Sequence, residues 1–318
     1  MASLDMQSNT TPALQIEPLQ GIALKVLSAL VFTAMSAMIK LVAVRIPTGE
    51  VMFARAFFGM LPIVLVMLTR GELRRALKTE HPAGHIVRGL VGVSAMFCSF
   101  MALGYLPLPD ATAIGYATPL VTVVLSALIL RETVRVFRWT AVIVGFFGVL
   151  LMLSPHLQAT ATNSGSAFGA GLALAGAVLA AGAMITVRHL TRTETTSAIV
   201  FYFSATASVL SLATLPFGWV MPSFGDALIL IAIGLTGGIA QIFLTQSYRY
   251  ADASTVAPFE YTTMLWSVAI GYVIFGDLPG IEIIVGAAIV ISAGIFVILR
   301  ERALRIESRK SRAARTPA

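Results

Sequence analysis

Long apolar segments recur along the whole chain and dominate what it can fold into. Ten of them approach or reach the length of about 20 residues that an α-helix needs to cross a lipid bilayer. They cover roughly residues 20–43, 50–69, 84–105, 109–130, 136–153, 167–187, 196–219, 225–247, 253–275 and 280–299. Inside lipid, only helices and closed barrels satisfy their own backbone hydrogen bonds. The pattern therefore predicts an all-α integral membrane protein with ten transmembrane helices.

The composition excludes most other classes of protein. Only 12% of the residues are charged, against about 25% in soluble domains. Cys98 is the one cysteine, so no intramolecular disulfide can form, and the four histidines show no metal-ligand spacing. We expect no metal and no cofactor. A multi-pass membrane enzyme is the rival class, but the loops are short and lack a nucleophile–base set, so no catalytic residue is predicted.

Lysine and arginine gather on one side of the predicted membrane. Seventeen of them fall in the gaps after the second, fourth, sixth and eighth windows and in the tail after the tenth, whereas Arg45 alone falls on the other side. By the positive-inside rule, both termini are cytoplasmic, as expected for a multi-pass protein of the bacterial inner membrane. Residues 1–19 lack lysine and arginine and are predicted to be a disordered tail. The basic tail 300–318 is expected near anionic lipid, and nothing supports a nucleic-acid partner.

The two halves of the chain resemble each other. The fourth window begins with Asp110-Ala-Thr-Ala-Ile and the ninth with Asp252-Ala-Ser-Thr-Val. Aligned from their ends, the windows place polar or small residues at equivalent positions: Gly115, Thr118, Thr122 and Ser126 in one, and Glu260, Thr263, Ser267 and Gly271 in the other. We therefore predict two repeats, 20–153 and 167–299, joined by an extracytoplasmic linker at 154–166. Because each repeat has five helices, the second enters from the opposite side, and such inverted repeats are typical of secondary transporters.

These segments carry a family resemblance. They are ALGYLPLPDATAIGYATPLVTVVLSALILRE and SYRYADASTVAPFEYTTMLWSVAIGYVIFGD. The pattern resembles the EamA family of the drug/metabolite transporter superfamily, in which the fourth helix of each half has a central proline and an acidic end. Pro119 and Glu132 match, whereas the second half has Met264 for the proline and Asp277 for the glutamate.

The resemblance implies a secondary-active transporter of a small organic metabolite, present as a monomer or homodimer. No GxxxxGK[ST] motif is present, so an ion gradient or solute exchange would drive it. Uptake of riboflavin or a similar planar vitamin is the best specific expectation. Export of amino acids or of other metabolites and drugs is the alternative.

Glu260 is the one ionisable residue between Asp252 and Asp277. A carboxylate at that depth costs at least about 2.5 kcal/mol unless it faces a bundle interior or a wet cavity. On a continuous helix, Glu260 shares a face with Thr263 and Ser267, whereas Val256, Leu265, Val268 and Tyr272 would face lipid. Glu260 can couple protons or bind a cationic substrate group, and the alternative is a structural carboxylate bonded to a neighbouring helix.

Other candidates accompany Glu260 in the predicted substrate site. They are Tyr261, Thr263, Trp266 and Ser267 on the ninth window, Tyr116 and Thr118 on the fourth, and Gln241 on the eighth. The aromatic rings can stack on a planar heterocycle or simply fill space between helices. Gln241 is an amide in an apolar segment and needs a partner from a ligand or a helix.

Four cations lie within the apolar windows and are not among the lysines and arginines counted between them. Lys40 and Arg55 are candidates for an anion-attracting outer vestibule, the alternative being snorkelling or pairing with Glu50. For Arg88 and Glu132 a structural ion pair or gate is favoured over substrate contact. Lys25 is expected to snorkel to the cytoplasmic headgroups.

Overall fold

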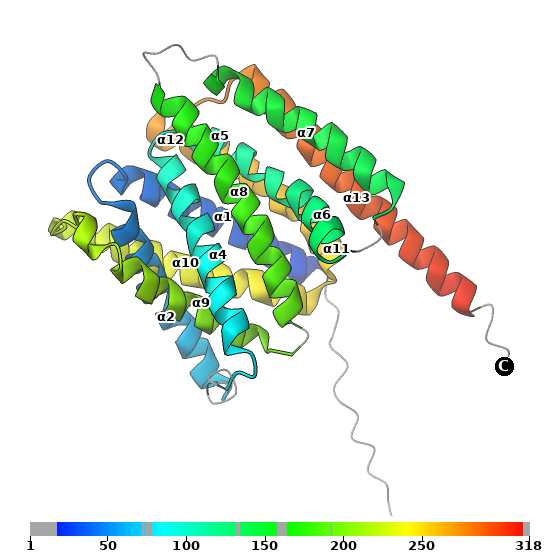
Figure 1. Cartoon of the computed structure of the whole chain (residues 1–318), viewed down its shortest axis with the longest axis horizontal. Coiled ribbons are helices and arrows are strands. Elements are labelled where there is room, and N and C mark those ends of the chain that lie inside the picture. The colour runs from blue at the N-terminus through cyan, green and yellow to red at the C-terminus, as the bar shows by residue number, and fades with distance from the viewer. Residues whose placement is uncertain are drawn as a thin grey trace, which may run out of the picture.

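The computed structural model describes residues 18–71, 73, 78–131, 134–157, 164–191 and 193–313. Within these ranges the chain is helical and has no β-strand (Figure 1). The helices are α1 (Pro18–Val42), α2 (Thr48–Thr69), α4 (Pro82–Leu103), α5 (Leu108–Gly115), α6 (Ala117–Ile129), α7 (Val136–Leu157), α8 (Ser164–Leu190), α9 (Thr196–Leu212), α10 (Phe224–Tyr250), α11 (Ala253–Val256), α12 (Thr262–Phe275) and α13 (Ile281–Ala313), with 3₁₀ turns η2 (Leu215–Phe217) and η3 (Ala257–Tyr261).

Every predicted apolar window coincides with helical structure. Among the described residues, eight helices are long and apolar enough to cross a membrane, α5 and α6 counting together as Leu108–Ile129. The remaining two windows hold α9, an apolar helix of 17 residues, and the segment that α11, η3 and α12 share. The protein is therefore a multi-pass membrane protein, as its composition predicts.

The fourth and ninth windows are both interrupted near their middle. Between α5 and α6 the helix breaks at Tyr116, because Pro119 cannot accommodate the carbonyl of Gly115 four residues earlier. In the ninth window Pro258 is the second residue of the 3₁₀ turn η3, which contains Glu260. The expected continuous helical face through Glu260, Thr263 and Ser267 is therefore wrong, because a 3₁₀ turn rotates side chains by a different angle per residue.

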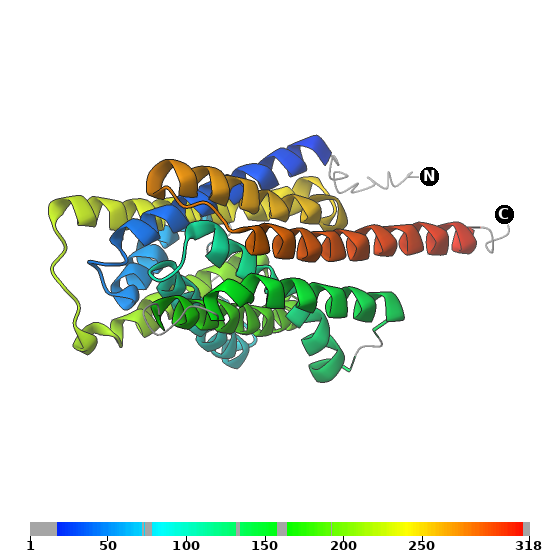
Figure 2. The same cartoon turned by 90° about the horizontal axis from the view of Figure 1, so that it is seen from above.

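The two ends of the bundle differ in what they hold. Figure 2 shows that the start of α1 and the end of α13 lie at one end, which we call the terminal end, while η2 lies at the opposite end. The most extensive contacts between helices are those of α4 with α8, α1 with α10, α7 with α13, and α2 with α10 and α9. Two apolar clusters fill the interior, one among α5–α8 and α13 and the other among α1, α2, α4 and α10.

Glycines bring pairs of helix backbones into direct contact. A Cβ placed on Gly238 of α10 would lie 2.5 Å from the carbonyl oxygen of Gly59 on α2. Between α7 and α13, a Cβ on Gly148 would lie 2.7 Å from the carbonyl oxygen of Gly286. Small residues at such crossings are how helices associate tightly in lipid, where burial of apolar surface supplies little drive.

Gly148→Ala is expected to lower the free energy of unfolding by about 1–3 kcal/mol, because its methyl group forces α7 and α13 apart. Gly171→Ala on α8 is the matched control. No described heavy atom lies within 4 Å of its Cβ position, so it should be neutral or stabilising by up to about 1 kcal/mol. Unfolding in detergent micelles measures both, and equal stability of the two variants would contradict the close α7–α13 contact.

Candidate functional site

A cavity of about 860 Å³ lies between α2, α4, α8, α9 and α10. It reaches from Arg55 in the first half of α2, and Gly237 in the middle of α10, to the terminal end of the bundle. There it is bordered by Arg70 after α2, by Thr191 after α8 and by Arg249 near the end of α10. The helices α2 and α10, whose backbones are in direct contact, therefore also contribute to the wall of this cavity.

The wall of this cavity is strongly positive. Four arginines line it, Arg55, Arg70, Arg88 and Arg249, and no aspartate or glutamate is among the described lining residues. The guanidinium carbon of Arg88 lies 4.1 Å from the centre of the Phe203 ring, an arrangement that stabilises the cation. The cavity can therefore hold an anionic group far better than a cationic one.

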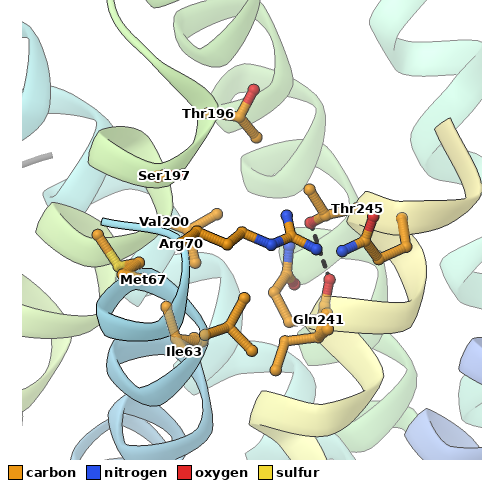
Figure 3. A pocket seen from close by; sticks show the side chains of 11 residues that line it. Ile63, Met67, Arg70, Thr196, Ser197, Val200, Gln241 and Thr245 are labelled. Atoms are coloured by element: carbon orange, nitrogen blue, oxygen red, sulfur yellow. Dashed lines mark hydrogen bonds between the residues drawn. The ribbon is translucent and has the colours of Figure 1, made fainter. Parts of the chain in front are cut away.

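A smaller recess of about 60 Å³ adjoins the cavity at the end of α2. In Figure 3 the Arg70 side chain extends from the end of α2 toward Thr245 and Gln241 on α10. Thr245 Oγ1 donates a hydrogen bond of 2.8 Å to the carbonyl oxygen of Gln241. The Gln246 side chain lies beside Arg70, and with its amide oxygen turned toward the guanidinium it accepts a hydrogen bond from Arg70 Nη1 at 3.2 Å. Of the residues predicted for the substrate site, Gln241 lines both this recess and the large cavity.

The turn between α8 and α9, at the mouth of the cavity, is fixed to the start of α4. Glu194 Oε1 accepts hydrogen bonds from Thr79 Oγ1 at 2.6 Å and from the backbone N–H groups of Glu80 at 2.9 Å and His81 at 3.0 Å. His85 Nε2 lies 3.7 Å from the same oxygen. Burial raises the pKa of Glu194, but these hydrogen bonds outweigh it, so the net pKa is lowered.

Comparison with known proteins decides the family. The model of the EamA-like transporter family matches residues 19–154 and again residues 167–300. The chain belongs to the EamA-like transporter family. This confirms the resemblance seen in the two repeated segments and supports transport as the general role of this membrane protein.

Several EamA-like relatives are named transporters. The pseudopaline exporter CntI of Pseudomonas aeruginosa is 30% identical over 277 residues, covering 86% of this chain and 94% of the relative. The S-adenosylmethionine uptake transporter of Rickettsia prowazekii is 30% identical over 284 residues, covering 89% and 94%. The riboflavin transporter of Vibrio cholerae is 27% identical over 302 residues, covering 94% and 97%.

The fold is also found in solved structures. A protein crystal structure matches 90% of this EamA-like chain and 97% of its own chain with a TM-score of 0.60. The sequence identity is 21%, so this likeness bears on the fold alone.

In this EamA-like protein Glu260 forms an ion pair with Lys25 of α1. The Lys25 side chain is only 3% exposed and the Glu260 side chain is 54% exposed. The expectation that Lys25 snorkels to the headgroups is therefore wrong. Its ammonium group is buried and paired with the Glu260 carboxylate on η3. Glu260 is not among the residues that line the large cavity.

The other candidates of the fourth and ninth windows contact each other. Tyr116 hydrogen-bonds Thr263 through its hydroxyl group, and its ring lies 5.2 Å from that of Tyr261. Ser267 is buried and donates to the carbonyl oxygen of Met264 at 2.9 Å. The contacts of Tyr116 join α5–α6 to η3–α12, whereas the Ser267 bond lies within α12. None of the four candidates lines the large cavity.

The remaining predictions for these two windows concern Thr118, Trp266 and the residues expected to face lipid. The Thr118 carbonyl accepts from Thr122 Oγ1 at 2.8 Å, and Trp266 Nε1 is buried without an acceptor in the described part of the chain. Val256 was expected to face lipid, but it is fully buried, because α11 packs against α1, α10 and α13. Leu265 and Tyr272 are exposed as expected, and Val268 packs against the core.

The two outer-vestibule candidates are separated. Lys40 Nζ lies 2.8 Å from Asp277 Oδ2 at the opposite end of the bundle and donates to the carbonyl oxygen of Leu106 at 2.7 Å. Arg55 lies in the cavity wall. Glu50, their expected partner, accepts instead from the N–H of Val220 at 3.2 Å.

Sequence reasoning missed Arg88 as a lining residue, and it also missed Arg70 and Arg249. Arg88 has no ion pair among the described residues, and Glu132 lies outside them. One signal was present: Lys25, Lys40, Arg55 and Arg88 are the cations within the apolar windows that the count by gaps left over. Intramembrane cations are expected either in pairs or along a cavity. The structure pairs Lys25 and Lys40 with carboxylates and places Arg55 and Arg88 in a cavity wall.

Glu260→Gln is expected to lower the free energy of unfolding by about 2 kcal/mol, below the 3–5 of fully buried pairs because Glu260 is half exposed. Stability would be lost because the buried Lys25 ammonium group is left without a carboxylate partner. The double variant Lys25→Met/Glu260→Gln should recover most of the loss. Unfolding of both singles and the double measures this, and a Glu260→Gln variant as stable as the wild type would show that the pair is not structural.

A second prediction concerns pH. The pKa of Glu194 is lower in the folded protein than its ordinary value of 4.5, so its charge stabilises the fold above about pH 4.5 and this contribution is lost as the pH falls through the folded-state pKa. Glu194→Gln should therefore cost about 1 kcal/mol at pH 7, with the difference from wild type shrinking as the pH falls through the folded-state pKa of Glu194. Thermal unfolding across this range measures it. Glu80→Gln is the control, since Glu80 contributes only its backbone N–H to Glu194. If Glu194→Gln lowered the stability equally at every pH, the charge of Glu194 would not be what stabilises the fold.

Proposed function

We propose that this protein is a secondary-active transporter that moves a small organic metabolite across the bacterial inner membrane by alternating access. The observation that carries the proposal is the cavity of about 860 Å³ between α2, α4, α8, α9 and α10. Its volume is in the range of sites for metabolite-sized ligands. It begins near the middle of spanning helices and reaches one end of the bundle, as a transport site must.

The packing of the helices supports two five-helix repeats of opposed orientation. If α1–α7 and α8–α13 are exchanged, the α1–α10 contact becomes the α8–α4 contact, and the α2–α10 contact becomes the α9–α4 contact. The α1–α12 contact likewise becomes the α8–α6 contact, while α2–α9 and α7–α13 map onto themselves. Two equivalent halves can exchange conformations, which is the physical basis of alternating access.

The charges supply the orientation. By the positive-inside rule the terminal end is cytoplasmic, so the cavity reaches the cytoplasmic side. At the opposite end Lys40 contacts Asp277, and Arg45 Nη2 lies 2.8 Å from Asp226 Oδ1. We infer an inward-facing state in which these ion pairs, with the Glu50–Val220 hydrogen bond, hold the extracytoplasmic side closed.

The proposal has two forms, which differ in the solute and in the direction of transport. Uptake of riboflavin or a similar planar vitamin is one, and export of amino acids, other metabolites or drugs is the other. The named relatives include both importers and exporters. Tyr116, Tyr261 and Trp266, which favoured a planar ligand, do not line this cavity, whereas Phe203 and Tyr248 do.

Thr245→Trp is expected to slow transport, because Thr245 lines both the cavity and its recess and an indole there would occupy part of the space that the solute needs. Purified protein in liposomes should exchange labelled solute from a panel of vitamins, amino acids and nucleosides. The Thr245→Trp rate should fall by at least about tenfold. Leu265→Trp, at a position 68% exposed on α12, should leave the rate unchanged. Full exchange by the Thr245→Trp protein would remove this cavity from the transport path.

A further inference from the structure

We infer that the cavity binds an organic anion, whose carboxylate or phosphate group lies between Arg55 and Arg88. This deepens the proposed function by naming the substrate class, and it rests on that function only for the claim that the bound anion is transported. Binding itself is a property of the cavity as it stands.

The first observation is the Arg88 guanidinium, which is held in place but lacks acceptors. Its Nε and Nη1 atoms are buried, and no hydrogen-bond acceptor among the described residues reaches them. The group is positioned from one side by the Phe203 ring, and Gly92 leaves the space that the guanidinium occupies. Buried donors on a charged group are costly unless an acceptor satisfies them. Because Arg88 lines the cavity, a ligand oxyanion that enters it lies beside this charge and supplies the counterion that the described residues lack.

The second observation is that Arg55 adds a like charge to the same space. Arg55 lines the same cavity as Arg88 and lies close enough for the two positive charges to repel each other. It lies along α10, where a Cβ on Gly237 would be 3.6 Å from Arg55 Cγ and Nε. Two neighbouring cations in a partly desolvated space are stabilised by an anion shared between them.

The contrast with other cations of the molecule is informative. Lys25, Lys40, Arg45 and Arg138 each have a carboxylate partner from a distant segment of the described chain. Arg55 and Arg88 have none among the described residues, and the described cavity wall contains no acid that could supply one. The fold pairs Lys25 and Lys40 of its apolar helices with carboxylates and leaves Arg55 and Arg88 of the cavity wall for a ligand.

The rest of the wall defines the kind of anion. A guanidinium matches the two oxygens of a carboxylate or phosphate group with parallel hydrogen bonds. Around it the cavity presents the Phe203 ring and the aliphatic side chains of Ile63, Val200 and Leu244. An organic acid with an apolar portion satisfies both surfaces, whereas an uncharged molecule of the same shape leaves the guanidinium donors unpaired.

Matched pairs of ligands test this on the purified protein. Thermal unfolding in detergent, titrated with benzoate, citrate and phenyl phosphate and with benzamide as the neutral match of benzoate, gives a dissociation constant for each probe. We expect saturable stabilisation by at least one of the anions. Benzoate should bind at least about tenfold more tightly than benzamide, the difference between a charged and a neutral hydrogen-bonded pair. Carboxylate against phosphate probes decides which oxyanion is preferred.

Variants assign the preference to the two arginines. Arg55→Gln and Arg88→Gln should each remove the preference for benzoate over benzamide. Arg138→Gln, which removes a guanidinium outside the cavity, should keep it. Arg88→Lys retains the charge without the planar fork and should bind benzoate with intermediate affinity; it also serves if Arg88→Gln does not fold.

The possible outcomes separate this inference from the transport proposal. Equal binding of benzoate and benzamide by wild-type protein, no saturable binding of any anion, or unchanged preference in both glutamine variants would overturn the anion site. The first two readouts need only wild-type protein, so they hold even if no variant folds. Anion binding without solute exchange in liposomes would sustain the site and remove the transport function. Exchange without anion preference would do the reverse.

Discussion

Direct contact between the backbones of α2 and α10 is the constraint on which the cavity depends. In lipid, helices gain little from burying apolar surface against each other, so close approach through glycine supplies dispersion contacts instead. Gly59 on α2 meets Gly234 and Gly238 on α10. The neighbouring Gly237 faces the Arg55 side chain. One glycine-rich stretch of α10 therefore packs the bundle and leaves room for a cavity arginine beside it.

The ion pairs of α1 show which parts can move relative to one another. Lys25 contacts Glu260 toward one end of α1, and Lys40 contacts Asp277 toward the other. Both acids belong to the ninth apolar segment or directly follow it. Any rearrangement that keeps both pairs must therefore move α1 and η3–α12 as one body. The walls of the cavity come from α2, α4, α8, α9 and α10. In the proposed cycle, opening the extracytoplasmic side breaks the Lys40–Asp277 pair and so frees the end of α12 from α1.

Local sequence patterns were sufficient for the helices and the family but not for the site. Apolar length located every helical segment, and the repeated motifs pointed to the EamA-like family that the comparison confirms. The interpretation of Glu260 assumed one regular helix, whereas Pro258 introduces a 3₁₀ turn. Its partner Lys25 is 235 residues away. Whether an embedded charge is paired or lines a cavity depends on which distant helices are neighbours, and no local pattern records that.

The positive wall also bears on how a transporter of this kind would cycle. Closing an empty cavity around Arg55 and Arg88 takes their charges out of water without a counterion, which is costly. A bound organic anion supplies the counterion and so lowers the free energy of the closed state relative to the open one. A ligand shifts a conformational equilibrium only by its difference in affinity for the two states. Under the anion proposal that difference is built into the two unpaired arginines, and the loaded protein changes sides more readily than the empty one, which favours exchange of anions over one-way movement.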